Sequence, residues 1–209
     1  VDRLVSAPSY VDISNDDTLL HFAAMTFDAA IFEIWGALAH GASLAILTEA
    51  LPSARQFERF FERHKVSLAW LTSGLFNALV DANPTCLKPI RQLIIGGDAI
   101  SVPHVKIALE HLTDTKLING YGPTENTTFT CCYAIPRSFL NLDINSIPIG
   151  VPIGRTSIAI VDENLNPVPQ GEIGELLAGG SGLALGYLND EELTATRFVT
   201  THENQERVY

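Results

Sequence analysis

The chain has 209 residues, 46% of them hydrophobic and 18% charged, which is enough apolar material for a folded core and excludes disorder as the main state. Lys and Arg number 13 against 24 Asp and Glu, so the formal net charge is −11 at pH 7. This balance argues against a nucleic-acid partner and against an anionic membrane surface, because both need clustered cations.

Strand-like and helix-like segments alternate between residues 19 and 122. Short apolar runs of strand length lie at residues 19–25, 43–47, 67–71, 93–95 and 116–118. Helical spacing marks the segments between them, at residues 54–64, 73–82 and 102–111. In the first helix Phe57, Phe60 and Phe61 share one face, which predicts a core contact. Such alternation is typical of a mostly parallel sheet covered by helices.

After Tyr133 the chain changes to short apolar runs, dense glycine and frequent proline. Apolar runs at 157–161 and 175–178 flank residues 162–171, whose Asn, Pro and Gly predict a hairpin-type connection. Residues 191–198 are expected to begin a closing helix. We therefore predict an α/β fold in which an α/β subdomain, residues 1–135, precedes an antiparallel β subdomain, residues 136–209.

Cysteine usage and hydropathy point to a cytoplasmic protein. Cys86, Cys131 and Cys132 are odd in number and two are adjacent, so no disulfide framework is predicted. Acidic residues interrupt the most apolar stretch, residues 22–47, which argues against a membrane span. The chain begins without Met and stops at Tyr209 without a helix cap, and we expect it to be a piece of a longer protein.

The strongest chemical signal lies in residues 116–128, where an apolar strand runs into the sequence Asn-Gly-Tyr-Gly-Pro-Thr-Glu. Glycine permits close backbone approach, and the ring of Tyr121 offers a flat face to a base. The hydroxyl of Thr124 suits a phosphate oxygen, and Glu125 offers the hard oxygen ligand that Mg²⁺ prefers. An ordinary turn after a buried strand is the alternative. The segment predicts a nucleotide site.

Residues 121–125 resemble the fifth core motif of adenylate-forming enzymes, specifically the amino-acid-activating adenylation domains of nonribosomal peptide synthetases. Residues 25–36 resemble the fourth motif and residues 174–189 the sixth, in the expected order. The resemblance implies that both predicted subdomains belong to the large N-terminal domain of such an enzyme, with the substrate pocket and adenine site in the first. The family's phosphate loop, ribose-binding motif and catalytic lysine fall outside the sequence, so residues 1–209 alone are not expected to turn over.

The resemblance assigns roles residue by residue. Thr124 and Glu125 are implied to be catalytic, with Glu125 as the metal ligand. The nucleotide-binding residues are implied to be Gly97, Asp98, Asn119, Gly120, Tyr121, Gly122 and Thr124. Among them, Asn119 falls near the adenine amino group and Tyr121 stacks on adenine.

A second set of residues is implied to line the amino-acid pocket: Asp28, Ala29, Phe32, Trp70, Ile94, Gly96, Gly120, Thr128 and Phe129. Asp28 resembles the carboxylate that pairs with the substrate's α-ammonium. A lone acid in an apolar run needs such a partner, although a helix N-cap is the alternative role for Asp28. The rest of the lining carries no charge and three aromatic rings, which leaves a small apolar cavity. Such a cavity suits a short branched side chain, and the combination resembles the lining that the family uses for L-valine. Isoleucine or leucine stays open, because one methylene is worth only about 1–3 kcal/mol.

The implied function is ATP-dependent formation of an aminoacyl adenylate, with ATP and Mg²⁺ as cofactors. The acyl group would then pass to a phosphopantetheine thiol on a peptidyl carrier domain, beside neighbouring synthetase domains. Two alternatives stay open. An acyl- or aryl-CoA ligase of the same superfamily is disfavoured by Asp28, since a fatty acid has no ammonium. A non-catalytic nucleotide-binding module is not excluded by the residues present.

Overall fold

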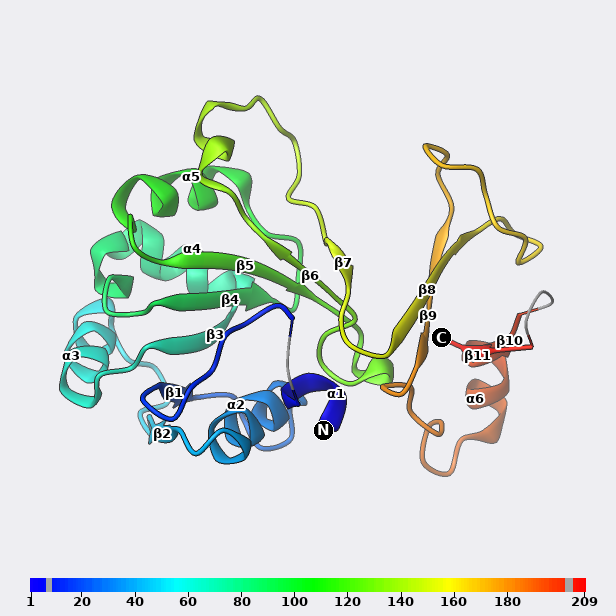
Figure 1. The fold of residues 1–209 in the computed structure, drawn as a ribbon, viewed down its shortest axis with the longest axis horizontal. Coiled ribbons are helices and arrows are strands. Elements are labelled where there is room, and N and C mark those ends of the chain that lie inside the picture. Colours follow the sequence, from blue (N-terminus) through cyan, green and yellow to red (C-terminus); the bar gives the residue numbers. More distant parts are fainter. Residues whose placement is uncertain (7–8, 202–204) are drawn as a thin grey trace.

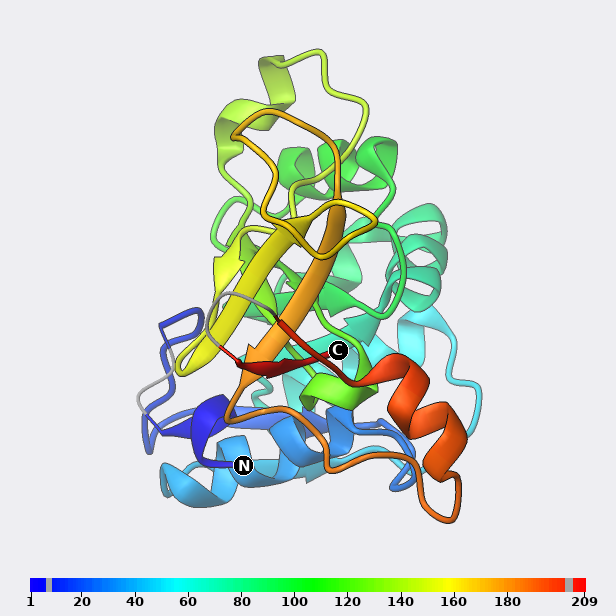
Figure 2. The same ribbon diagram turned by 90° about the vertical axis from the view of Figure 1, so that its right-hand side faces the viewer.

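A computed structural model describes residues 1–6, 9–201 and 205–209 of the chain. Figure 1 shows a large sheet with helices on both faces, followed by a small second sheet. The turned view of Figure 2 places the second sheet in front of the first. This arrangement confirms the predicted fold class, a mostly parallel α/β unit followed by antiparallel β structure.

The large sheet has seven strands in the order β2-β1-β3-β4-β5-β6-β7. The strands from β2 to β5 in this order run parallel, whereas β6 and β7 are antiparallel to their neighbours. Their bounds are β1 Thr18–His21, β2 Ser43–Ile46, β3 Leu68–Thr72, β4 Gln92–Gly96, β5 Lys116–Tyr121, β6 Cys131–Ala134 and β7 Val151–Pro152. The carboxyl ends of the parallel strands therefore lie along one edge, where open α/β sheets bind ligands.

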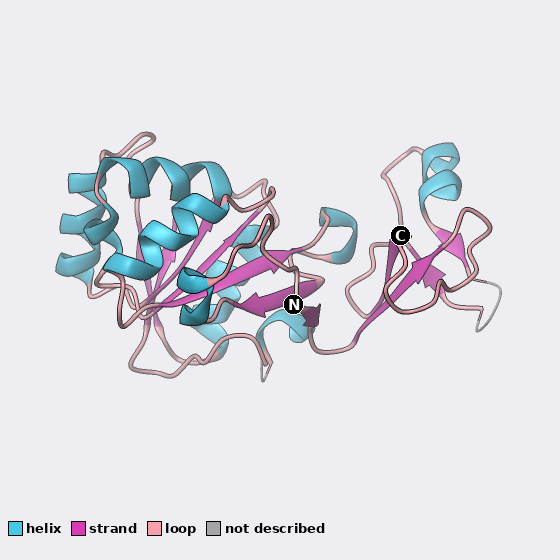
Figure 3. Cartoon of the chain, turned by 90° about the horizontal axis from the view of Figure 1, so that it is seen from above, coloured by secondary structure: helices cyan, strands magenta, loops and turns pink. Residues whose placement is uncertain are grey.

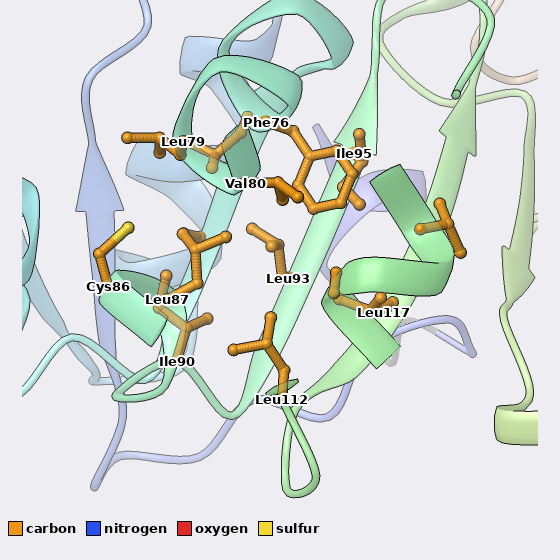
Figure 4. Packing of buried hydrophobic residues seen from close by; sticks show 14 of the residues in the cluster. Phe76, Leu79, Val80, Cys86, Leu87, Ile90, Leu93, Ile95, Leu112 and Leu117 are labelled. Carbon is orange, nitrogen blue, oxygen red and sulfur yellow. The ribbon is translucent and has the colours of Figure 1, made fainter. Parts of the chain in front are cut away.

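Successive side chains of the central strands enter different cores, as the period of two in a strand requires. Leu93 and Ile95 pack in one core and Ile94 in the other. The first core, part of which appears in Figure 4, is covered by α3 (Ala54–His64), α4 (Ser73–Ala82) and α5 (Val102–His111). The second is covered by α1 (Asp2–Val5) and α2 (Ala29–Ala39).

The predicted aromatic stripe of α3 lies in the first core. Phe57 and Phe61 are fully buried, and Phe60 packs against the same cluster while partly exposed. The helix begins with a capping box of Ser53 and Gln56, which satisfies amide groups that the first turn leaves unpaired. The predicted bounds of α3, α4 and α5 all agree with the structure.

The second sheet is antiparallel in the order β10-β11-β9-β8, with α6 (Glu191–Arg197) before its edge strand. Its strands are β8 Thr156–Val161, β9 Glu175–Gly180, β10 Val199–Thr200 and β11 Arg207–Val208, and three short 3₁₀ helices, η1 Pro84–Leu87, η2 Thr124–Asn126 and η3 Arg137–Asn141, complete the elements. Residues 162–171 connect β8 to β9, as predicted. The first sheet continues to β7, beyond residue 135, and the boundary at 135/136 stays a prediction.

Two strands, β1 and β5, differ most in length from the prediction. The run expected at residues 19–25 is a strand only as far as His21, because the buried carboxylate of Glu33 accepts the amides of Phe22 and Ala23 and takes them from the sheet. Strand β5 instead continues to Tyr121, three residues beyond the apolar run. The sequence there is typical of a turn because it contains Gly120. Pairing of Gly120 with Gly96 of β4 and Cys132 of β6 nevertheless keeps it in the sheet.

The three cysteines are all buried and free, which agrees with the prediction of no disulfide framework. Within the ranges that the structure describes, no helix has the length and apolar character needed to cross a membrane.

Candidate active site

A cavity of about 500 Å³ opens at the carboxyl ends of β4 and β5. The predicted nucleotide-binding residues line it, with the exception of Thr124: they are Gly97, Asp98, Asn119, Gly120, Tyr121 and Gly122. Another part of the wall is formed by Asn145, Ser146, Ile147 and Ile149, and the sequence reasoning missed them because no motif marks this loop. Loop and strand ends thus make a mostly apolar slot with few polar groups, the character of a small-molecule site.

The loop after β4 is shaped by glycine and by a buried serine. Gly97 has φ 82°, a conformation that side chains disfavour. The hydroxyl of Ser73, the first residue of α4, donates to the backbone oxygen of Asp98 at 2.8 Å. These contacts hold Asp98 at the cavity wall.

Asn119 lies on the cavity wall near the end of β5 and is almost fully buried. Its Nδ2 donates to the backbone oxygen of Pro148 at 2.9 Å, and this bond fixes the side-chain amide. Its Oδ1 is left as an acceptor. Tyr121 is the last residue of the same strand and is 38% exposed. An acceptor oxygen beside an aromatic face matches the edge and the face of an amino-substituted purine.

A second cavity, of about 550 Å³, shares Tyr121 and Pro123 with the first. Its other walls come from the second sheet and the segments next to it, and they include Glu175 of β9, Arg197 of α6 and Tyr209 after β11. Tyr121 therefore stands between two cavities, one bounded by the large sheet and one by the small sheet.

The turn after β5 carries Thr124 and Glu125 in η2. Thr124 is exposed and Glu125 half-buried. The hydroxyl of Tyr187 donates to Glu125 Oε1 at 2.5 Å, and this bond raises the pKa of Tyr187 above its usual value. The sequence reasoning missed this contact of Tyr187 with Glu125. Tyr187 lies in the sixth motif and Glu125 in the fifth, and the signal that could have indicated the contact was that both motifs serve one site.

Asp28 immediately precedes α2, but its side chain does not cap that helix. Its Oδ2 accepts the backbone amide of Thr128 at 3.1 Å, and the hydroxyl of Thr128 donates to the backbone oxygen of Asp28 at 2.9 Å. The N-cap alternative is therefore not the geometry seen. The carboxylate of Asp28 faces the turn that follows Glu125, and this turn lies about a hundred residues after Asp28 in the chain.

The other predicted pocket residues gather on the α2 side of the large sheet. Phe32 of α2 lies 5.4 Å from Phe129, centroid to centroid, and both rings are buried. A Cβ on Gly120 would lie 2.8 Å from Cγ2 of Ile94 and 2.9 Å from Cε1 of Phe129. The same core contains Ala29 and Trp70. Gly120 also lines the 500 Å³ cavity, so it joins the two predicted sets of residues.

Trp70 has two features that the sequence did not suggest. It lines a separate apolar cavity of about 210 Å³, together with Phe22, Ala23, Phe27 and Leu75. Its buried Nε1 has no hydrogen-bond partner in the part of the chain that the structure describes. Phe27 packs against its ring at a centroid distance of 5.5 Å. Trp70, one of the predicted pocket residues, therefore borders open space.

Gly96 of β4 pairs with Gly120 of β5, and the two backbones approach closely there. Replacing Gly96 by alanine is expected to lower the free energy of unfolding by about 1–3 kcal/mol. Its new Cβ would overlap the backbone oxygen of Gly120, so the two strands would have to separate. Urea unfolding of Gly96→Ala and the unchanged protein measures the effect. Gly74→Ala, where a Cβ in α4 meets nothing within 4 Å, is the matched control and is expected to retain or gain stability. Equal losses in both variants would contradict this account.

Glu125 is the predicted Mg²⁺ ligand. Among residues 1–6, 9–201 and 205–209, no group of three or more His, Cys, Asp or Glu side chains is placed to hold a metal. Mg²⁺ commonly binds one or two carboxylates and completes its coordination with water and phosphate oxygens. Glu125, at the turn between the two cavities, fits this mode of binding but not a dedicated protein cage.

A mostly parallel sheet with this cavity at its carboxyl edge is the arrangement of a ligand-binding open α/β protein. The family model for the AMP-binding enzyme matches residues 3–188, and the chain belongs to that family. The chain is 52% identical to one component of the linear gramicidin synthase of Brevibacillus parabrevis, over 94% of this chain and 2% of that protein. It is 40% identical to bacitracin synthase 3 of Bacillus licheniformis, over 94% of this chain and 3% of that protein. The chain thus spans a small part of the length of these relatives. The resemblance to the adenylation domains of nonribosomal peptide synthetases, inferred from three motifs, is confirmed.

Solved structures give the same result. Holo-PA1221, a nonribosomal peptide synthetase protein that contains adenylation and PCP domains, was solved with a vinylsulfonamide inhibitor and matches with a TM-score of 0.91 and 40% identity. The match covers 99% of this chain and 36% of that one. The N-terminal subdomain of Klebsiella oxytoca NpsA, in complex with 3-hydroxybenzoyl-AMSN, matches with a TM-score of 0.89 and 32% identity, over 99% of this chain and 52% of that one.

Proposed function

We propose that the chain is the central part of an adenylation domain that joins the carboxylate of an aliphatic amino acid to the α-phosphate of ATP. Pyrophosphate leaves and an aminoacyl adenylate is held. The observation that carries the proposal is the bond between Asp28 and Thr128, which ties a carboxylate at the start of α2 to the turn that follows the nucleotide-binding residues of β5. The similarity to gramicidin and bacitracin synthases supports it.

The nucleotide would be held by groups from β5 and the turn that follows. Asn119 Oδ1 is the acceptor for the adenine amino group, and Tyr121 presents its ring to the base. The hydroxyl of Thr124 serves a phosphate oxygen, and Glu125 holds Mg²⁺. The ion supplies positive charge against the charge that develops on phosphate. These residues then act mainly by orientation and by electrostatic stabilisation.

Asp28 would bind the α-ammonium of the amino acid. Its carboxylate is fixed by the amide of Thr128 on one side, which leaves its remaining lone pairs for a cation. An acyl- or aryl-CoA ligase has no use for this charge, since its substrate carries no ammonium. A nucleotide-binding module without turnover would bind ATP and show no exchange of pyrophosphate with either kind of substrate. The exchange assay, run with amino acids and with fatty acids, therefore separates all three functions.

We further propose that the acyl group passes to a phosphopantetheine thiol on a peptidyl carrier domain, beside other synthetase domains. The similarity to PA1221, which contains adenylation and PCP domains, supports this partner. Three buried free cysteines suit the reducing cytoplasm as the place of action.

Valine is the expected substrate of the protein that carries this sequence, with isoleucine weaker by only about 1–3 kcal/mol. Phe32, Trp70 and Phe129 share one buried core. As the aromatic walls of the proposed pocket, they should exclude phenylalanine and tryptophan. Trp70→Ala is expected to shift preference toward larger side chains, because it would extend the pocket into the 210 Å³ cavity that Trp70 borders. ATP–pyrophosphate exchange across the common amino acids measures the preference.

Leu71→Ala is the matched control for Trp70→Ala, because Leu71 faces the opposite core and borders the same small cavity. It should leave the order of amino acids unchanged. Preference for an acidic, basic or large aromatic amino acid would exclude valine but keep adenylation. Activity with a fatty acid and none with amino acids would favour the CoA ligase alternative.

A further inference from the structure

The turn that carries Thr128 has an unfavourable backbone. Thr127 and Thr128 lie at φ 49° and 64°, in the left-handed region. β-Branched residues are disfavoured there, and two in succession persist only where surrounding groups fix them. Something other than local preference must hold this turn.

Arg3 supplies that restraint from the far end of the chain. Its Nη2 donates to the backbone oxygens of Asn126 at 2.5 Å and Thr127 at 2.7 Å, and its Nη1 donates to that of Phe129 at 2.6 Å. Nη1 also donates to the hydroxyl of Thr156, the first residue of β8, at 2.6 Å. Figures 1 and 3 show the N-terminal segment at the junction of the two sheets, where this turn lies.

The guanidinium is built into the fold. Arg3 is only 6% exposed, and no carboxylate of the described residues lies within ion-pair distance of it. A Cβ on Gly182 would overlap its Nη2, and a Cβ on Gly154 would lie 3.1 Å from its Cγ. Both glycines therefore give it room. A buried cation that donates to three carbonyls of one turn directs most of its hydrogen bonds to that turn, while its Nε has no partner among the described residues.

Asp28 holds the same turn from the other side, by accepting the amide of Thr128. The positively charged guanidinium of Arg3 therefore donates to carbonyl oxygens of the turn, and the negatively charged carboxylate of Asp28 accepts an amide of the same turn. If the carbonyls lost Arg3, the backbone of Thr127 and Thr128 could relax to ordinary φ values. The amide would then turn away from Asp28.

We propose that Arg3 is a positioning residue for the amino-acid site: it fixes residues 126–129 so that Thr128 orients the carboxylate of Asp28 toward the substrate. This rests on the proposed function only for the identity of the ligand. Arg3 touches no substrate. Its loss should therefore weaken amino-acid binding much more than ATP binding, because Asn119 and Tyr121 lie on β5, before the turn.

The test uses Arg3→Lys and Arg3→Met in the full-length protein that carries this sequence. Lysine keeps the charge but lacks the planar fork that reaches several carbonyls at once. Hydrogen exchange, followed by mass spectrometry on peptides covering residues 122–134, should become faster by about tenfold or more in both variants, as expected when local bonds open. The KM for the amino acid should rise about tenfold, with the KM for ATP changed less than about threefold.

Thr156→Val is the matched control. Among the described residues, it removes the hydrogen-bond partner of Arg3 that lies outside the turn. Exchange at 122–134 and both KM values should therefore stay close to those of the unchanged protein. Unchanged exchange in Arg3→Lys would overturn the proposal, as would equal rises in both KM values with faster exchange throughout the protein. If Arg3→Met fails to fold, Arg3→Lys decides. If the unchanged protein activates no amino acid, the proposed function fails, while hydrogen exchange still decides the role of Arg3.

Discussion

Replacement of Asp28 by asparagine is expected to lower kcat/KM for every amino acid by a factor of about 10²–10³, since leaving a buried charge without its partner costs about 3–5 kcal/mol. Asparagine keeps a side-chain oxygen that can accept the amide of Thr128, so the turn is retained while the charge is lost. The α-ammonium of the substrate would then meet an uncharged amide inside an apolar wall. ATP–pyrophosphate exchange at varied amino-acid concentration measures the loss.

Asp28→Ala separates the two roles of this carboxylate. It removes both the charge and the acceptor for Thr128, so it should match Asp28→Asn in activity and, unlike it, speed hydrogen exchange at the turn. The KM for ATP should change little in either variant. An asparagine variant with unchanged activity would show that Asp28 serves the fold and not the ammonium.

Glu125→Gln is expected to lower the adenylation rate by about 10²–10³, the usual effect of removing one electrostatic stabiliser of a transition state. It should also raise the magnesium concentration needed for half-maximal rate, because an amide oxygen is a weaker ligand than a carboxylate. Rates measured across a magnesium titration give both quantities. Identical titration curves would leave Glu125 as a turn residue only.

Tyr187→Phe is the matched control for Glu125→Gln. It removes the hydroxyl that donates to Glu125 Oε1 but leaves the carboxylate in place. The variant should therefore keep its response to magnesium. A loss as large as that of Glu125→Gln would show that the bond between the two residues, and not the carboxylate itself, supports the reaction.

Local patterns predict the helices well and the contacts between distant segments poorly. The bounds of α3, α4 and α5 follow from apolar spacing and from end signals such as the capping box at Ser53 and the proline at Pro103. Strand β1 is shorter than predicted because its end depends on Glu33, whose buried carboxylate accepts two of the following amides. Burial raises the pKa of Glu33. The spacing of apolar residues along the chain does not predict that this carboxylate is buried.

The site divides in the same way. The sequence motif predicts that Asn119, Tyr121 and Glu125 share one site, because all three lie within a single short segment of the chain. The partner of each hydrogen-bonded member is remote: Pro148 for Asn119 and Tyr187 for Glu125. Such pairs depend on how distant segments pack, and residue spacing carries no information about that.

The position of Tyr121 between two cavities has a consequence for any ligand that reaches both. Such a ligand binds in two halves joined around one aromatic ring. When one half leaves, the other keeps it nearby at high effective concentration, so rebinding competes with escape. Retention of an extended nucleotide then depends on the linkage between its halves, whereas a fragment that fills a single cavity has no second anchor.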